Sequence, residues 1–512
     1  MSSNNHQKLA HRKRKISHRL RPRHWTAQAQ PMLRAGNMHY DVSGRIRAVD
    51  AGGIGALHLL ARHTGLVDAI DHRVHVLKRH LPYHESDHVL GIAYNVLSGG
   101  TCLQDIERRR HDEAYLDALG AQRIPDPTTA GDFCRRFEAA DLEALQDAIN
   151  ATRVRVWQTQ PAPFFDEAFL EADGTLAPTT GACKAGMDIT YKGTWGYHPL
   201  VLSLANTAEP LFVVNRPGNR PSAEGAAARF DQGIALCRDA GFRRVTLRGD
   251  TDFTQTTHLD RWDAAGCRFV FGNDARANVV ALADALPEAA WTPLTRPAPY
   301  AVQTEPRRRP LNTKEAVVTA RGFRNLRLQG EAVADFAYRP TACARPYRMV
   351  VLRKNISVAE GAHRLFDEIR YFFYLTNDTI TPATDLVFLA NDRCHQENLL
   401  DQLKHGVGAM ALPVDTLLAN GAYMVMAALA WTLKAWFALR LPVIPGRWAA
   451  QHAAERRAVL RMEFKAFREA FIQVPTQIIR AGRRLVFRLL SWNPWVHVLL
   501  RAVDPRRHPL RC

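Results

Sequence analysis

The sequence is poor in cysteine, and its cysteines follow no spacing that would hold a metal ion or a set of disulfides. Eight of them are spread between Cys102 and Cys512 of a 512-residue chain, without a CxxC pair or a zinc-type pattern of cysteine and histidine. Scattered cysteines are typical of reduced thiols in an intracellular protein. The pattern argues against a zinc module and against a secreted disulfide scaffold.

Long apolar runs are scarce as well. The N-terminal residues are polar and basic, with no apolar run of a signal peptide after them, so we expect a cytoplasmic protein. Residues 416–433 carry no charge and approach the length of a membrane span. Asn420 and Gly421 interrupt this segment, and Asp415 and Lys434 bound it. We therefore predict a helix buried in the protein core, and no membrane partner.

Acidic residues are scarce at the two ends of the chain. Residues 8–23 contain eight Lys or Arg and no acid, and from Arg440 onward there are fifteen Lys or Arg against four acids. Residues 24–439 carry a net charge of −1, out of +18 for the whole chain. Because clustered cations release counterions from nucleic acid on binding, this distribution indicates DNA or another polyanion as partner. Basic tails that only aid solubility are the alternative.

Apolar residues make up 46% of the sequence, which is enough to form hydrophobic cores in two to four domains. Residues 1–37 are expected to be a basic disordered arm. Residues 38–160 have apolar residues at intervals of three and four, which predicts a helical DNA-binding domain. Within it a helix beginning at Pro127 breaks near Ala139 and resumes, which resembles a helix-turn-helix arrangement. An ordinary helical hairpin is the alternative.

The middle of the chain predicts an α/β fold. In residues 165–274, three short strands with short links indicate an antiparallel meander, and an Ala-rich helix then crosses to a strand that ends at Gly249. Such a crossover can place the first and fourth strands side by side. The remaining predicted parts are a β-rich insertion over 275–370, a second part of the core over 371–440 and a basic helical region over 441–512.

The basic C-terminal region contains one segment that favours an amphipathic helix, residues 476–490. In such a helix Arg480, Arg483, Arg484 and Arg488 would share one face, opposite apolar residues. We expect this face to meet DNA phosphates. A helix lying on a membrane surface is the alternative.

Three carboxylates stand where an α/β protein places its chemistry. Asp173 and Asp250 come at the ends of two predicted strands, and open α/β sheets hold their sites at such ends. Glu397 lies in a helix predicted over residues 391–404, with Arg393 and Lys404 on the same face. Carboxylates are the ligands that Mg²⁺ prefers, and two such ions can promote displacement at a phosphodiester. The pattern therefore predicts metal-dependent phosphoryl transfer on DNA.

Each carboxylate also has a purely structural interpretation. An aspartate at a strand end often caps the following backbone amides, and Glu397 can simply keep a helix face in water. Glu171 is a rival of Asp173, and Asp252 of Asp250, because residues two apart share a face of a strand. The residues alone leave these alternatives open.

These residues resemble the DDE transposases of bacterial insertion sequences, closest to the insertion-sequence family numbered 1380, the DDE group 1 transposases. The similarity rests on ADGT around Asp173, LRGDTDF around Asp250, an R-x3-E-x6-K pattern around Glu397, and the tail VPTQIIRAGRRLVFRLLSWNPW. It runs from about residue 38 to the end. The resemblance implies a ribonuclease H-like core in which Asp173, Asp250 and Glu397 hold two Mg²⁺ ions, which Mn²⁺ can replace.

The resemblance also implies cut-and-paste movement of an insertion sequence in the bacterial cytoplasm, at the nucleoid. The partners would be the terminal inverted repeats and target DNA, bound by a homodimer in the synaptic complex, with Arg393 and Lys404 on phosphates. Ala390 stands where related transposases have a Tyr, so one phosphate contact of those relatives is in doubt. Thr251 and Asp252 replace a more usual Ser-Gly, which leaves the acidic triad intact. A non-catalytic repressor, an inactive derivative, or a nuclease without strand transfer are the alternatives.

Overall fold

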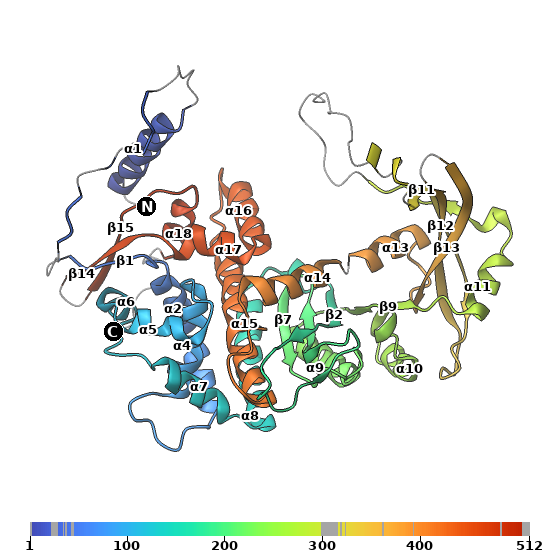
Figure 1. Cartoon of the computed structure of the whole chain (residues 1–512), viewed down its shortest axis with the longest axis horizontal. Coiled ribbons are helices and arrows are strands. Elements are labelled where there is room, and N and C mark those ends of the chain that lie inside the picture. The colour runs from blue at the N-terminus through green and yellow to red at the C-terminus, as the bar shows by residue number, and fades with distance from the viewer. Residues whose placement is uncertain are drawn as a thin grey trace.

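The computed structural model describes most of the chain (Figure 1). A helical part lies at one end, a mixed sheet runs through the middle, and three long strands stand at the other end. The described residues are 3–21, 29–33, 35, 38–41, 46–297, 316–317, 320–322, 324–360, 363–392, 394–481 and 484–503.

A nine-stranded sheet of order β10-β11-β12-β13-β9-β8-β2-β6-β7 organises the molecule. In its core half β6 pairs antiparallel with β2 and β7, while β8 runs parallel to β2 and β9 parallel to β8. The predicted meander and crossover are therefore confirmed. The core strands are β2 (Ala168–Gly174), β6 (Leu200–Leu204), β7 (Glu209–Val214), β8 (Val245–Gly249) and β9 (Arg268–Asn273).

Helix α9 (Ala226–Ala240) makes the crossover and covers one face of the core strands. Gly233 permits this close packing, because a Cβ there would lie 2.7 Å from a methyl carbon of Leu202 and 3.1 Å from one of Leu170. Since side chains alternate along a strand, the residues on either side of Leu170 point to the opposite face. That face therefore carries Glu171. Helix α10 (Thr256–Ala264) follows β8.

The predicted β-rich insertion extends the core sheet. Strand β13 pairs antiparallel with β9, from Phe373 opposite Asn273 to Thr376 opposite Val270. The predicted boundary at residue 370 falls inside β13, because one long strand serves both parts, with Phe373 buried in the core. The elements here are α11 (Ala277–Asp284), η4 (Glu288–Ala290), β10 (Thr292–Pro293), β11 (Arg324–Tyr338), β12 (Tyr347–Glu360) and β13 (His363–Thr376).

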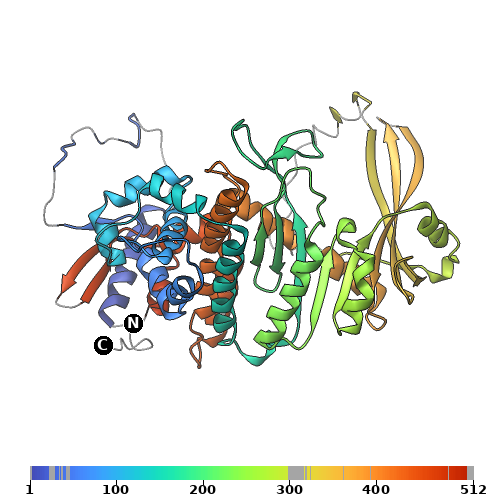
Figure 2. The same ribbon diagram turned by 90° about the horizontal axis from the view of Figure 1, so that it is seen from below.

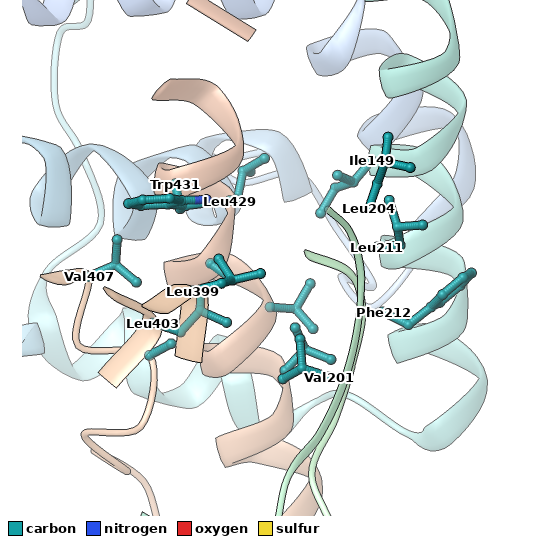
Figure 3. Close-up of a cluster of buried hydrophobic side chains, with 14 of the residues drawn as sticks. Ile149, Val201, Leu204, Leu211, Phe212, Leu399, Leu403, Val407, Leu429 and Trp431 are labelled. Carbon is teal, nitrogen blue, oxygen red and sulfur yellow. The ribbon is translucent and has the colours of Figure 1, made fainter. Parts of the chain in front are cut away.

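Helix α15 (Leu417–Arg440) is the buried helix predicted from its apolar sequence. By length and composition it is the one helix in the described part of the chain that could span a membrane, and its most apolar stretch is entirely buried in the protein. It begins at Thr416, whose hydroxyl accepts the Ala419 N–H at 3.2 Å. Figure 3 shows Leu429 and Trp431 of α15 in a cluster that also contains residues from α8 (Ala139–Trp157), β6, β7 and the segment before α15.

The N-terminal part is helical, as predicted for residues 38–160. Pro127 is the first residue of α7, after the Asp126 cap that accepts the Thr129 N–H at 2.8 Å, and a new helix begins at Ala139. Base reading by this pair stays a prediction. The elements are β1 (Ala48–Val49), α2 (Ile54–His63), α3 (Leu66–Arg73), α4 (Glu85–Leu97), η1 (Leu103–Asp105), α5 (Ile106–Arg110), α6 (Glu113–Leu119), α7 (Pro127–Arg135), α8 (Ala139–Trp157) and η2 (Ala162–Phe165).

The expected disorder of residues 1–37 is wrong for α1 (Ser3–Arg19), which is a helix. Its sequence has no Gly or Pro and is rich in Lys and Arg, which both have good helix propensity. The Arg12 guanidinium also donates to the backbone carbonyl of Leu489 at 2.9 Å. Tertiary contact thus adds to local propensity.

The helix predicted over residues 476–490 is also wrong. This segment forms two antiparallel strands, and β14 pairs with β1, Ala48 lying opposite Gln477. Its β-branched residues suit a strand, and β1 supplies a partner that the local sequence does not reveal. Arg480 pairs with Asp117, and Arg483 lies outside the described residues. The C-terminal elements are α16 (Ala449–Arg461), α17 (Phe464–Phe467), η6 (Arg468–Ile472), β14 (Thr476–Ala481), β15 (Arg484–Leu489) and α18 (Val496–Ala502).

Candidate active site

Two of the predicted aspartates end neighbouring parallel strands. Strands β2 and β8 pair in parallel with Leu170 opposite Leu247 and Glu171 opposite Arg248. Continued for two more residues, this register places Asp173 opposite Asp250, on strands about 4.8 Å apart. Both residues are partly buried. The crossover thus brings together two carboxylates that are 77 positions apart in the sequence.

The rival Glu171 has a structural role in the same two strands. Its side chain is 1% exposed and forms an ion pair of 2.6 Å with Arg248. The Arg248 guanidinium also donates to the Leu389 carbonyl at 2.9 Å and lies 4.8 Å from the centre of the Phe169 ring. This buried pair joins β2 to β8 two residues before the aspartates. It favours Asp173 over Glu171 as the residue that meets a ligand.

Asp250 caps the turn that follows β8. One of its carboxylate oxygens accepts the Asp252 N–H at 3.0 Å, at the start of the 3₁₀ turn η3 (Thr251–Phe253). The structural interpretation of this residue is therefore observed. A carboxylate has about four lone-pair positions. The capping bond therefore fixes the position of the group and still allows it to bind a metal ion. Asp252 itself is exposed.

Glu397 lies on α14 (Cys394–Asp401), which crosses the sheet face opposite α9. The preceding residue, Gln396, is buried; its amide donates to the Val201 carbonyl at 3.3 Å and accepts the Ser203 hydroxyl. Val201 lies opposite Asp173 in the sheet. Gln396 thus docks α14 beside the aspartate strand, and Glu397 follows at the exposed flank of the helix.

The single helix predicted over residues 391–404 is divided in the structure. Helix α13 (Ala383–Asn391) ends before α14 begins, and Lys404 lies in a π-helical turn, Gln402–Gly406. Arg393 lies outside the described residues, so its predicted place beside Glu397 stays a prediction. A π-helical turn changes the phase of the helix, which is a tertiary feature that sequence periodicity does not show.

The donor set suits a hard cation, because carboxylate oxygens are what Mg²⁺ and Mn²⁺ prefer. Asp173 and Asp250 supply a neighbouring pair of such donors through the strand register. Among the residues that the structure describes, no three Asp, Glu, His or Cys side chains gather closely enough to hold an ion. The described arrangement is therefore an aspartate pair with Glu397 on the adjoining helix.

Comparison with known proteins identifies the family to which this sequence belongs. The sequence matches the family described as "Transposase DDE domain group 1" over residues 30–508. The chain belongs to this transposase family. The predicted resemblance to DDE group 1 transposases is thereby confirmed, while membership of the insertion-sequence family numbered 1380 stays a prediction.

No curated protein matches the sequence. Among solved structures, the cryo-EM structure of a piggyBac transposase synaptic complex with hairpin DNA is similar over 82% of this chain and 79% of that chain. The sequence identity is 10% and the TM-score is 0.36.

In this member of the transposase family, one of the predicted cations, Lys404, lies near Asp173 and near a second cation, Lys192. Burial lowers the pKa of the Lys404 ammonium, and the positive charge of Lys192 lowers it further, while the charges of Asp173 and Asp401 act in the opposite direction. Lys404 therefore lies within electrostatic reach of both Lys192 and Asp173. The sequence analysis singled out Lys404 and missed Lys192.

His198 is a further residue that the sequence analysis missed. A Cβ at Gly174, the residue after Asp173, would lie 2.7 Å from the His198 Nε2 atom. The other ring nitrogen lies 2.8 Å from the Arg220 carbonyl, to which it donates when protonated. Burial is the main cause that lowers the pKa of His198. The ring thus packs against the end of β2.

A small sheet of β3 (Ala177–Pro178), β5 (Trp195–Tyr197) and β4 (Asp188–Ile189) stands between β2 and β6 in the sequence. Tyr191 lies in the turn between β4 and β5 and is 75% exposed, with its ring centre 6.3 Å from that of His198. The Lys192 ammonium lies 5.6 Å from the Tyr191 ring. The signal in the sequence was YKGTWGYH, since aromatic residues next to a cation are typical of nucleic-acid contacts.

Proposed function

We propose that this protein is a DNA transposase that binds the terminal inverted repeats of its own insertion sequence and moves it by cutting and joining DNA. The observation that carries the proposal is the parallel register that brings Asp173 opposite Asp250, in a chain that belongs to the transposase DDE family. Under this proposal Asp173, Asp250 and Glu397 form the acidic triad.

A ribonuclease H-like core is part of this proposal. Its support is the strand order β7-β6-β2-β8-β9, with three antiparallel strands followed by two that run parallel to β2. The first aspartate ends β2 and the second follows β8, so both stand at one edge of the sheet. Helix α14, which carries Glu397, lies on the face opposite α9 (Figures 1 and 2).

The triad would hold Mg²⁺ or Mn²⁺. When bound between carboxylates, such ions supply Lewis-acid stabilisation to a phosphodiester undergoing displacement. The residues of the chain have separate tasks. Asp250 is held at its position by the Asp252 N–H, the Glu171–Arg248 pair holds β2 against β8, and Gln396 holds α14 on the sheet.

Lys404 and Lys192 would bind phosphate oxygens next to Asp173. Their mutual repulsion is relieved when an anion lies between them, and the partial burial of Lys404 strengthens that attraction. Arg393, four residues before Glu397, is proposed as a further phosphate ligand. The exposed ring of Tyr191 offers a surface on which a nucleotide base can stack.

Two displacements on DNA complete the proposal. In the first, water attacks the phosphodiester at the element end and the 3′-oxygen leaves as a hydroxyl. In the second, that 3′-hydroxyl attacks a target phosphodiester and displaces its 3′-oxygen. Joining two ends calls for two copies of the active site, so we propose a homodimer that acts in the cytoplasm on the nucleoid.

The N-terminal helices and the basic ends would hold the repeats. Helix α1 presents exposed cations along its length, which suits binding to a phosphate backbone. They are Lys8, Lys13, Arg14, Lys15 and Arg19.

The test is cleavage of a labelled duplex that carries the DNA flanking the gene, with Mg²⁺ or with EDTA. We expect metal-dependent nicking at the element boundary in the wild type and in Asp252→Asn, and none in Asp173→Asn, Asp250→Asn or Glu397→Gln. Retained nicking in all three triad variants overturns the site. Binding without nicking in every protein points to a repressor or an inactive derivative. Nicking without joining to a second DNA points to a nuclease.

A further inference from the structure

A cleft of about 1120 Å³ opens beside the amino end of β2, where the end of α15 and helix α16 meet the core. Four arginines and two acids line it. They are Arg244, Arg440, Arg456, Arg457, Asp166 and Glu167. The lining thus carries a net excess of positive charge, and the cleft lies at the opposite end of β2 from the proposed active site.

The two acids of the cleft are already neutralised by neighbours. Asp166 accepts the Arg243 guanidinium at 2.7 Å. Glu167 forms an ion pair of 3.3 Å with Arg244 and accepts the Thr246 hydroxyl at 2.6 Å. Neither carboxylate therefore offers charge to the other arginines of the cleft.

Three arginine side chains remain, and in the described part of the chain their guanidinium groups make no hydrogen bond or ion pair. They are Arg440, Arg456 and Arg457. Arg456 is half-buried, and burial alone lowers its pKa, with no carboxylate acting against that loss. A desolvated cation that lacks a counter-charge is costly, and an anion that enters the cleft removes this cost. The site is therefore built to receive negative charge.

The shape of the cleft favours a polymer over a single small anion. Its volume is far larger than one phosphate group needs. Arg440 comes from α15, whereas Arg456 and Arg457 come from α16. Guanidinium groups form bidentate bonds with phosphate oxygens. Apolar residues such as Leu441 and Val443 also line the cleft, and they can pack against the sugars between phosphates.

We infer that this arginine cleft binds the phosphodiester backbone of DNA at a distance from the cleaved bond. Glu167 is six residues before Asp173 in the sequence, which along a strand corresponds to about 20 Å. At 3.4 Å per base pair this is a separation of about six base pairs. The cleft thus contributes affinity for the DNA and takes no part in the chemistry. This inference rests on the proposed function.

The test compares Arg456→Ala/Arg457→Ala with Arg461→Ala, a control on the same helix whose exposed arginine lies outside the cleft. Fluorescence anisotropy of a labelled duplex over a range of salt gives the affinity and its salt slope. We expect the double variant to bind several-fold more weakly and to lose about 0.9 of slope for each phosphate contact removed. The control should match the wild type, and the cleavage rate at saturating DNA should be unchanged.

A second variant, Arg456→Lys, keeps the charge and serves if the double variant unfolds. An intermediate affinity with the slope retained supports the inference. The inference is overturned if the double variant keeps the affinity and the salt slope of the wild type. It is also overturned if polyglutamate competes for the cleft as well as unlabelled DNA does, because the cleft would then be a site for acidic peptide. If the wild type binds no DNA at all, the proposed function itself fails, and this outcome is distinct from a cleft that has no effect.

Discussion

Arg248 and Glu171 form a buried ion pair of 2.6 Å between the two parallel strands that end in the proposed catalytic aspartates. The pair lies two residues before Asp173 and Asp250 along β2 and β8. It therefore joins the strands at the point where their ends have to stay in register. The arrangement around the candidate site depends on this pair as well as on the aspartates themselves.

Arg248→Met should destabilise the protein by about 3–5 kcal/mol, because it leaves the Glu171 carboxylate buried without its counter-charge. The double variant Glu171→Gln/Arg248→Met should recover a large part of that loss, since it leaves no charge behind. Denaturant unfolding of the wild type, both single variants and the double variant measures this coupling. A loss in the double variant equal to the sum of the two single losses would show that the pair contributes no mutual stabilisation.

Lys404→Ala should reduce cleavage of the DNA substrate on the order of tenfold, as expected for the loss of one charge-assisted hydrogen bond to phosphate. Lys404→Arg should retain more activity because it keeps a cation beside Asp173. Lys465→Ala on α17 is the control, since Lys465 is exposed and lies outside the candidate site. Steady-state cleavage assays separate the variants, and equal activity of Lys404→Ala and Lys465→Ala would rule out the phosphate role.

Stability should rise with pH above neutrality because of Lys434 in the buried helix α15. Burial lowers the pKa of this lysine from 10.5 to about 7. Between these values the unfolded state binds the proton and the folded state does not, so each pH unit adds up to about 1.4 kcal/mol to the free energy of unfolding. Below about pH 7 both states are protonated and this contribution is constant.

Lys434→Met should abolish that rise, which denaturant unfolding between pH 6.5 and 9.5 can measure. The lysine ammonium donates to the Leu460 carbonyl at 2.7 Å and lies 3.8 Å from the centre of the Trp431 ring. Both contacts favour the charged form and act against burial. If the free energy of unfolding of the wild type changes as little with pH as that of the variant, these two contacts outweigh the effect of burial on the Lys434 pKa.

Gly233→Ala should destabilise the docking of α9 on the sheet by about 1–3 kcal/mol, because the new Cβ would lie 2.7 Å from Leu202. Gly91→Ala in α4 is the matched control, since a Cβ there meets no atom within 4 Å. Alanine has the better helix propensity, so the control should be neutral or slightly more stable than the wild type. Thermal unfolding compares the two, and equal midpoints would contradict the packing argument.

The core strands and the buried helix α15 were predictable because their signals are local. Short apolar runs between turn residues indicated β2, β6, β7 and β8, and the crossover rule placed β8 beside β2. From this the meeting of Asp173 and Asp250 followed. The uncharged run that became α15 likewise needed only its own composition to be predicted as buried.

Contacts between distant segments settled the rest. Residues 476–489 form strands because β1, more than 400 residues earlier, supplies a pairing partner. The place of Glu397 depends on Gln396 docking against Val201 and on a break between α13 and α14. The arginine cleft joins α15 and α16 with the start of β2. Sequence periodicity describes one element at a time, whereas each of these features depends on favourable contacts between two or more elements.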